Sequence, residues 1–325
     1  MNNKRIAVIF TGGTISMEKH DQTSKAIIKE NQSDLIQNIK DELRGIELEI
    51  NTYSLKPSPS ITPQDMFKLA KLTENYFNDS TIDGIVITHG TDTLEETAYF
   101  LDSYLETKKP VVFTGSMRNY SELGFDGLSN LVSSILVAAH DESKKFGVLL
   151  VMNDEINAAS EVTKTHTLSL DTFKSMEFGP IGIVEQDNVL YYRDRHFKDT
   201  KVKPEHVVSE VEIIKSYAGA SSDILNFVIS NGVKGIVIEA LGRGNLPPTM
   251  IPGIKNAIDK GIPVLITSRC PKGRVLDSYG YEGGGHQLKN IGCIFTKNIN
   301  SQKARIRLML VLGITSDISE IKNYF

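Results

Sequence analysis

A strand, a sharp turn and a helix follow one another within residues 82–98, and this stretch constrains the fold more than any other. The run Ile85-Val86-Ile87 is short and β-branched, which is typical of a strand buried on both faces. His89-Gly90 ends that run where the backbone must turn sharply. A helix is predicted over Leu94–Leu105 because acidic residues occupy its first turn. The stretch therefore predicts a buried strand, its covering helix, and three polar residues between them.

Those three residues, Thr91, Asp92 and Thr93, allow two interpretations. Backbone amides and hydroxyl groups at a helix N-terminus form a ready anion site above the strand end. Alternatively, Asp92 and Thr93 are plain caps of the helix that follows. From this segment alone, both interpretations stand.

Strands and helices alternate along the rest of the chain, which indicates a mainly parallel sheet covered by helices on both faces. In the first part, strands are expected at Lys4–Phe10, Glu47–Leu55, Ile85–Ile87, Pro110–Thr114 and Phe146–Met152, and helices at Ser33–Leu43 (capped by Ser33), Pro63–Phe77, Leu94–Leu105 and Gly127–His140. In the second part, strands are expected at Val211–Ile214, Gly235–Ile238 and Pro263–Thr267, and helices at Ser222–Asn231, Met250–Lys260, Ser301–Leu312 and Ser316–Asn323.

The chain has 325 residues, which suits two α/β domains better than one. The alternating pattern weakens around Tyr191–Ser209, a segment with several charged residues and one proline. We therefore predict a larger N-terminal domain at 1–190 with a doubly wound, mainly parallel sheet, a linker at 191–210, and a smaller C-terminal α/β domain at 211–325.

Composition and charge disfavour several classes of protein. The formal net charge is −4 and no basic stripe is visible, so a nucleic-acid groove is not expected. The apolar run Ile6–Phe10 is too short for a secretory signal, and no window is long enough to span a membrane, so we expect a cytoplasmic protein. Cys270 and Cys293 lack C-x-x-C spacing, and the seven histidines are scattered, so we expect reduced thiols and no metal site.

The loops that follow the strands are rich in glycine and hydroxyl residues, and a doubly wound sheet gathers such loops into one crevice. They are Thr11–Ile15, Lys56–Ser60, His89–Thr93, Gly115–Arg118 and Asn153–Glu155. Nucleotide-binding glycine motifs and the G-x-S-x-G elbow do not occur. The glycine-rich runs Gly242–Asn245 and Gly283–His286 are expected to be tight turns. The pattern favours a small polar ligand held by hydrogen bonds.

A threonine-based site remains as the candidate chemistry. A threonine hydroxyl is a weak nucleophile unless a base removes its proton. Lys164 is a candidate base, because an amine can accept that proton once burial and neighbouring groups leave it neutral. Taken singly, Lys164 is expected to be a surface charge and Thr14 a turn residue. His89 is expected to be a hydrogen-bonded histidine at a strand end rather than a catalyst.

Read together, several segments resemble the bacterial asparaginase/glutaminase family. They occur in order over essentially the whole chain: Thr11–Ile15, Thr88–Thr93 followed by Glu95–Ala98, Gly115–Arg118, Val151–Asp154, Val162–Thr165, Gly244–Leu246 and Gln302–Arg305. The resemblance implies hydrolysis of L-asparagine to L-aspartate and ammonia, without a metal or cofactor. It also implies a homodimer or homotetramer in which a neighbouring C-terminal domain completes the site.

The same resemblance assigns roles to individual residues. Thr14 is the implied nucleophile that takes the acyl group, and Thr91, Asp92 and Lys164 form a second hydroxyl, carboxylate and base set that activates either Thr91 or the attacking water. Which of the two threonines attacks first stays open at this point. Asp92 would also bind the substrate's α-ammonium group. The remaining implied contacts are Ser58 and the backbone amides near Gly13 and Thr91 for the carboxylate and oxyanion, Ser116 for the substrate amide, and Asn245 with the Tyr279–His286 loop from a neighbouring chain.

Two positions depart from the family pattern. Many relatives carry a tyrosine in the loop after T-G-G-T, whereas Ser16–Glu30 contains none. Our hypothesis is that Tyr279, Tyr281 or Glu282 takes over that contact. Relatives often have a glutamine where this chain has Pro59, which lacks a backbone donor and a side-chain amide. We therefore expect weaker substrate binding or an altered preference among amides.

Two other functions stay open at this point. One is an ammonia-releasing component of an amidotransferase that acts on charged tRNA, since that family shares the threonine motifs. Such a component is expected to carry an additional N-terminal domain, and here T-G-G-T begins at Thr11. The other is a binding protein that senses asparagine or aspartate without turnover.

Overall fold

The computed structural model describes residues 4–13, 15, 17–19, 26–28, 33–43, 45–196 and 200–325. The chain divides into two compact units, which we call unit 1 (Met1–Lys198) and unit 2 (Asp199–Phe325). The division lies within the 191–210 segment that the sequence assigns to a linker.

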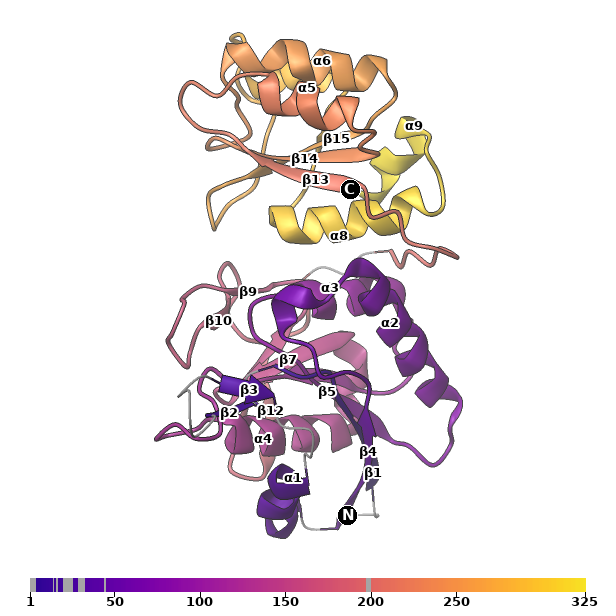
Figure 1. The fold of residues 1–325 in the computed structure, drawn as a ribbon, viewed down its shortest axis with the longest axis vertical. Helices are drawn as coiled ribbons and strands as arrows, with labels where there is room; N and C mark the ends of the chain where they lie inside the picture. Colours follow the sequence, from indigo (N-terminus) through magenta and orange to yellow (C-terminus); the bar gives the residue numbers. More distant parts are fainter. Residues whose placement is uncertain are drawn as a thin grey trace. The chain divides into compact units, whose positions relative to one another are not determined.

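Unit 1 is built on a large, mainly parallel sheet (Figure 1). Its parallel strands are β4 (Ile46–Thr52), β1 (Lys4–Phe10), β5 (Gly84–Thr88), β6 (Val111–Thr114) and β7 (Val148–Met152). An antiparallel extension follows β7, formed by β8 (Glu155–Ala158), β11 (Gly182–Glu185) and β12 (Asn188–Tyr191). Among the described residues the strand order is β12-β11-β8-β7-β6-β5-β1-β4. The predicted doubly wound α/β class is confirmed.

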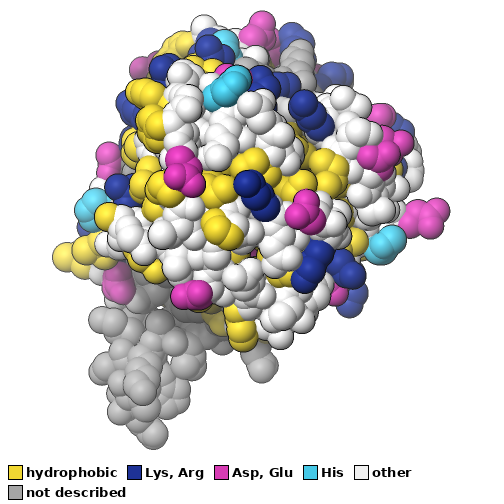
Figure 2. Space-filling view, turned by 90° about the horizontal axis from the view of Figure 1, so that it is seen from above, with side chains coloured by type: hydrophobic (Ala, Val, Ile, Leu, Met, Phe, Trp, Pro, Cys, Tyr) yellow, Lys and Arg dark blue, Asp and Glu magenta, His cyan; other side chains and the backbone are white. Residues whose placement is uncertain are grey.

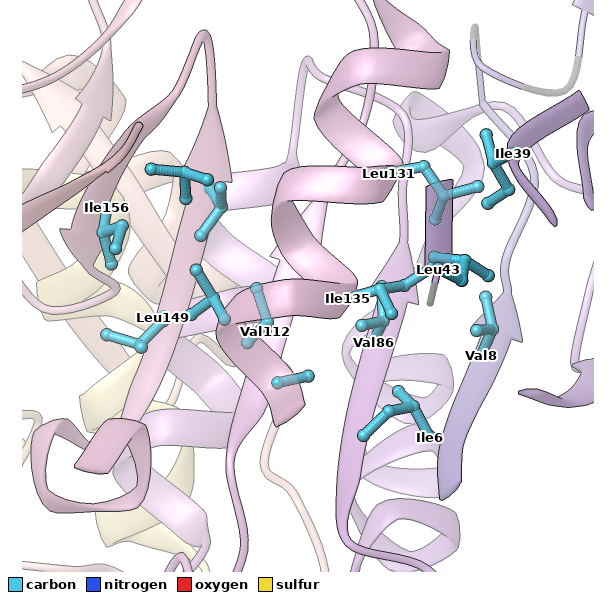
Figure 3. Packing of buried hydrophobic residues seen from close by; sticks show 14 of the residues in the cluster. Ile6, Val8, Ile39, Leu43, Val86, Val112, Leu131, Ile135, Leu149 and Ile156 are labelled. Atoms are coloured by element: carbon cyan, nitrogen blue, oxygen red, sulfur yellow. The ribbon is translucent and has the colours of Figure 1, made fainter. Parts of the chain in front are cut away.

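Helices cover both faces of this sheet. On one face lie α2 (Pro63–Asn78) and α3 (Leu94–Tyr104), and on the other lie α1 (Ser33–Ile39) and α4 (Gly127–Ala139) (Figure 1). Figure 3 shows Leu131 and Ile135 of α4 beside Val86 and Val112 of the sheet. The neighbours of Val86 in β5 point to the opposite face and are equally buried. Burial on both faces, as predicted for this strand, keeps β5 rigid beneath the loop that follows it.

Several boundaries in unit 1 differ from the prediction. The α-helix that begins at Ser33 ends at Ile39 and continues as a 3₁₀ turn over Lys40–Leu43, whereas one helix over Ser33–Leu43 was predicted. The side chain of Ser33 lies outside the described residues. The strand predicted at Glu47–Leu55 spans Ile46–Thr52, because its parallel pairing ends where Thr52 meets Phe10, the last residue of β1.

The antiparallel extension of the sheet and a separate hairpin were not predicted. The hairpin consists of β9 (Val162–Lys164) and β10 (Phe173–Ser175). Strands of three or four residues are too short for a period of two to be recognised. This miss matters, because β9 carries Lys164.

Unit 2 has a smaller sheet of four parallel strands within its described residues, in the order β13 (Val211–Lys215), β14 (Gly235–Ala240), β15 (Val264–Ser268) and β16 (Ile294–Phe295). Helices α5 (Asp223–Ser230) and α6 (Ile251–Asp259) lie on one face and α8 (Ser301–Leu312) on the other (Figure 1). The predicted smaller α/β domain is confirmed.

Two predictions in unit 2 need correction. Within the run expected to be a tight turn, Gly283 does adopt a positive φ of 83°, but Gly285 begins the helix α7 (Gly285–Ile291). The helix predicted over Ser316–Asn323 is α-helical only in α9 (Ile318–Ile321) and then tightens into a 3₁₀ turn. Asp317 sets its start, since the Asp317 side chain accepts a hydrogen bond from the Ser319 amide.

The charges on the surface and the state of the cysteines agree with what the composition predicts. On the coloured part of the face in Figure 2, basic and acidic side chains are interspersed. Cys270 and Cys293 are both free, and burial raises the pKa of the Cys293 thiol to about 12. Within the described ranges, no helix combines the length and the apolar character required to cross a bilayer.

Candidate active site

Three loops at the carboxyl ends of β1, β4 and β5 pack backbone against backbone. Gly12 and Gly13 have positive φ angles of 102° and 85°. A Cβ atom on Gly12 would lie 2.4 Å from the Lys56 carbonyl oxygen, and one on Gly13 would lie 2.3 Å from the Gly90 Cα atom. Both positions therefore require glycine for conformation and for space. These glycines bring the T-G-G-T loop directly against the loop after β5.

The His89 ring joins the loop after β5 to helix α3 through hydrogen bonds. The ring is buried, its Nδ1–H donates to the Gly90 carbonyl oxygen over 2.8 Å, and its Nε2 lies 2.9 Å from Thr97 Oγ1. Burial lowers the pKa of His89 to about 4, although the bond to Gly90 opposes that shift. The ring is therefore neutral at pH 7, and the prediction of a hydrogen-bonded histidine at a strand end is confirmed.

The polar residues just before α3 form hydrogen bonds with the loop after β4, and the N-cap residue Thr93 does not cap the helix. Thr93 occupies the N-cap position but makes no side-chain cap hydrogen bond. Its hydroxyl donates to the Ser58 carbonyl oxygen over 2.8 Å, and the Asp92 amide donates to Ser58 Oγ over 3.2 Å. The capping interpretation is therefore wrong for Thr93. The loop after β4 is fixed to the start of α3.

Lys164 joins Thr91 and Asp92 from more than seventy residues away. Its Nζ atom donates to Thr91 Oγ1 over 3.0 Å and to Asp92 Oδ1 over 2.7 Å. The Thr91 residue is 6% exposed and the Lys164 side chain 17%, whereas the Asp92 side chain is 63% exposed. The amine is thus largely shielded from solvent, between a buried hydroxyl group and an accessible carboxylate.

Glu95 holds the backbone of the same lysine. This residue is 5% exposed, and its Oε2 atom accepts the Lys164 amide over 3.1 Å. The sequence predicted Glu95 only as an acid favoured by the dipole of α3. No sequence signal separates it from Glu96, because both lie in the first turn of the helix.

These loops enclose a cavity of about 210 Å³. It is lined by Gly13, Ser58, Thr91, Asp92 and Lys164, to which the resemblance assigns substrate-binding or catalytic roles. Four other lining residues belong to loops that the sequence predicts around a crevice, namely Pro57, Pro59, Gly90 and Met117. The sequence did not assign Thr167, which also lines the cavity, to a site.

The outcome differs among the other predicted site residues. Ser116 is fully buried and donates its hydroxyl to the Arg118 carbonyl oxygen over 2.7 Å, while its neighbour Met117 lines the cavity. Asn245 belongs to unit 2, where its Oδ1 atom accepts the Gly285 amide over 3.2 Å. Thr14 lies outside the described residues.

Tyr279, Tyr281 and Glu282 are exposed residues of unit 2, and the two tyrosine rings lie 5.6 Å apart. Within the described parts of the chain, no group of three or more His, Cys, Asp or Glu side chains is arranged to hold a metal ion. The absence of a cofactor stays a prediction.

Comparison with known proteins identifies the family. Residues 5–197 match the model for "Asparaginase, N-terminal", and residues 210–325 match the "Glutaminase/Asparaginase C-terminal domain". This chain belongs to the asparaginase family. The two matched regions leave only a short segment between them, at 198–209.

Individual relatives agree with this assignment. The chain is 34% identical over 314 residues to an L-asparaginase of Bacillus licheniformis, covering 96% of each chain. It is similar to the crystal structure of a probable cytoplasmic L-asparaginase from Campylobacter jejuni, with a TM-score of 0.88, 32% identity, and coverage of 99% of this chain and 98% of the other. It is also 31% identical to a component of the glutamyl-tRNA(Gln) amidotransferase of Methanobrevibacter smithii, covering 98% of this chain but 74% of that protein.

Proposed function

We propose that this asparaginase-family chain is an L-asparaginase, which hydrolyses the side-chain amide of L-asparagine to L-aspartate and ammonia. One observation carries the proposal: a shielded lysine amine lies within hydrogen-bond distance of Thr91 and Asp92 at the wall of a cavity of amino-acid size. Family membership supports amide hydrolysis, and the relatives named L-asparaginase support asparagine as the substrate.

In the proposed mechanism, Thr14 attacks the amide carbon and takes the acyl group. Gly13, to which Thr14 is covalently bonded, lines the cavity. The Thr14 hydroxyl loses its proton as the new carbon–oxygen bond forms, and the leaving nitrogen gains that proton as the carbon–nitrogen bond breaks, so ammonia departs and the acyl group remains as an ester of Thr14. The set of Thr91, Lys164 and Asp92 then activates a water molecule, which cleaves the acyl ester and restores the Thr14 hydroxyl. No metal or cofactor takes part in this scheme.

Substrate binding follows from groups that line the cavity. The accessible Asp92 carboxylate suits the α-ammonium group of an amino acid. Ser58 Oγ accepts the Asp92 amide, which leaves its own hydroxyl proton for the substrate's α-carboxylate. The backbone amides of Gly13 and Thr91 are proposed to stabilise the developing oxyanion.

Two predicted contacts take a weaker or more distant form in this proposal. The Ser116 hydroxyl is engaged with Arg118, so Ser116 acts on the substrate amide through the loop that carries Met117. Asn245 is proposed to act in a homodimer or homotetramer, where unit 2 of a neighbouring copy completes the site. Light scattering on the purified protein measures this assembly, and a monomer at assay concentrations would contradict it.

The proposal also includes a cytoplasmic location, supported by similarity to the probable cytoplasmic L-asparaginase of Campylobacter jejuni. Fractionation of cells that produce the protein from its own gene tests this location. Recovery outside the cytoplasm would contradict it.

Pro59 is proposed to weaken substrate binding. It lines the cavity, and it supplies neither the backbone donor nor the side-chain amide of a glutamine. Pro59→Gln should therefore lower the KM for asparagine while leaving kcat similar. An unchanged KM in that variant would contradict the role of Pro59.

The contact made by a loop tyrosine in many relatives is proposed to come from Tyr279, Tyr281 or Glu282, all of which are exposed. Tyr279→Phe, Tyr281→Phe and Glu282→Gln test each residue in turn. Unchanged turnover in all three variants would remove this hypothesis.

Ammonia release from asparagine, glutamine and aspartate tests the proposed function. We expect release from asparagine, none from aspartate, and loss of release in Thr14→Ala. Ammonia release that depends on glutamine and charged tRNA would favour the amidotransferase alternative. Similarity to the Methanobrevibacter smithii relative motivates this alternative. Asparagine binding without any ammonia would indicate a sensing protein instead.

A further inference from the structure

We propose that Glu95 is a positioning residue that holds the backbone of Lys164, so that the lysine amine reaches Thr91 and Asp92. The proposal rests on the proposed function and deepens it. Its basis is the hydrogen bond from the Lys164 amide to Glu95 Oε2, over 3.1 Å, made by a carboxylate group on a residue that is 5% exposed.

The hairpin that carries Lys164 needs such a support. Strand β9 pairs with β10 alone in a two-stranded sheet, separate from the large sheet of unit 1. Two-stranded hairpins are marginally stable by themselves. Helix α3 packs against β9, whereas β10 packs against β8, so α3 is the element that supports the strand carrying Lys164.

Glu95 takes the place of a further strand at the outer edge of β9. The Thr165 amide donates to the Thr172 carbonyl oxygen across the hairpin. Because successive amides along a strand point in opposite directions, the Lys164 amide points away from β10. The Glu95 carboxylate accepts this outward amide, and the N-terminal dipole of α3 stabilises the buried negative charge.

The residues just before α3 and in its first turn thereby hold Lys164 at both ends. Thr91 and Asp92 bind its amine, and Glu95, four residues after Thr91, binds its backbone. Proton transfer between Thr91 and the amine changes the bonds at the amine but not the bond at the backbone. Glu95 thus keeps the distance between lysine and threonine constant through the reaction cycle.

Glu95→Ala removes the acceptor and tests this role. We expect kcat for asparagine to fall about 10- to 100-fold, because an error of about 1 Å in the position of a catalytic group has an effect of this size. KM should stay within about threefold, since Ser58 and Gly13 are untouched. Glu95→Gln keeps an oxygen acceptor and should restore most of the turnover.

Glu96→Ala is the matched control, because it removes an acid from the same helical turn. We expect its kcat to remain near that of the unaltered protein. Hydrogen exchange of the amides at 162–165, measured by mass spectrometry, should be faster in Glu95→Ala and unchanged in Glu96→Ala. If Glu95→Ala does not fold, Glu95→Asp shortens the side chain at constant charge and should show the same loss of turnover.

The results separate two kinds of failure. If the unaltered protein releases no ammonia from asparagine, the proposed function itself is overturned. If it does release ammonia, the positioning role is overturned by unchanged kcat in Glu95→Ala, by failure of Glu95→Gln to restore turnover, or by unchanged exchange at 162–165.

Discussion

The N-termini of α2 and α3 each bring together a threonine, an aspartate and a lysine, yet the two clusters do different work. At α2, Lys56 Nζ lies 3.0 and 2.9 Å from the two Asp65 carboxylate oxygens, and the Thr62 hydroxyl donates to Asp65 over 2.8 Å. Thr62 also accepts the Asp65 amide and completes a capping box. This cluster is local, because its members lie within ten residues of one another.

At α3 the lysine comes from a distant hairpin, and the Thr91 hydroxyl group is not used to cap the helix. Thr91 precedes the N-cap residue Thr93, whose side chain makes no cap hydrogen bond and donates to the Ser58 carbonyl oxygen instead. Thr91 is buried and borders the cavity, whereas Thr62 is exposed. Residue types alone therefore do not define this site. What defines the site is a buried threonine outside the N-cap position, next to a shielded lysine and a cavity.

The largest expected contrast comes from the two lysines. Lys164→Met should lower kcat for asparagine by about 10²- to 10⁴-fold, the usual contribution of a proton-transfer group. Lys56→Met should leave kcat unchanged, because its ion pair only supports a helix start. Steady-state ammonia release from both variants measures the contrast. Equal losses in the two would remove the distinction between the clusters.

The second contrast concerns the pH dependence of stability, because the loop before α3 contains the buried histidine His89. With a pKa near 4 in the folded state, His89 stays neutral while the unfolded chain takes up a proton below pH 6.5. Stability is therefore full above pH 6.5 and lost progressively as the pH falls toward 4, by about 3 kcal/mol.

His89→Asn keeps a donor for the Gly90 carbonyl but does not titrate. Its unfolding free energy, measured by urea denaturation, should consequently change less between pH 6.5 and 4. Identical pH dependence in the two proteins would show that His89 contributes nothing to it.

The smallest contrast lies at α2. Burial raises the pKa of Asp65, but hydrogen bonds from Lys56 and Thr62 outweigh it, and the net pKa lies below the ordinary value of 3.8. Such a carboxylate stabilises the fold above pH 4, and this contribution fades as the pH falls through its lowered pKa. Asp65→Asn should cost about 1 kcal/mol at pH 7 and leave turnover unchanged. A large loss of turnover would mean that the α2 cluster also serves the reaction.

The fold could be predicted where burial imposes a pattern. The run Ile85–Ile87 is buried on both faces and belongs to the middle one of the five parallel strands. The Thr62-Pro63 start of α2 follows from its own cap. The antiparallel strands after β7 could not be predicted, because their pairing is decided by partners distant in the chain rather than by a local period.

The site was predictable in part for the same reason. Thr91 and Asp92 follow from a strand that ends in a sharp turn before a helix. Lys164 could be named as a candidate base, but taken singly it resembles any surface lysine until the hairpin that carries it is folded, so the family resemblance was needed to favour the catalytic role. Glu95 differs from Glu96 solely in the direction in which the helix presents it, which neither composition nor motif reveals.

A double-mutant cycle on Thr91 and Lys164 tests the central claim most directly. The measured quantity is kcat/KM for asparagine in Thr91→Val, Lys164→Met and the combined variant, with thermal unfolding to verify that each is folded. If the two side chains act as one proton-transfer unit, the combined variant should lose no more than the more impaired single variant. Losses that multiply in the combined variant would contradict the account, because the two groups would then act independently.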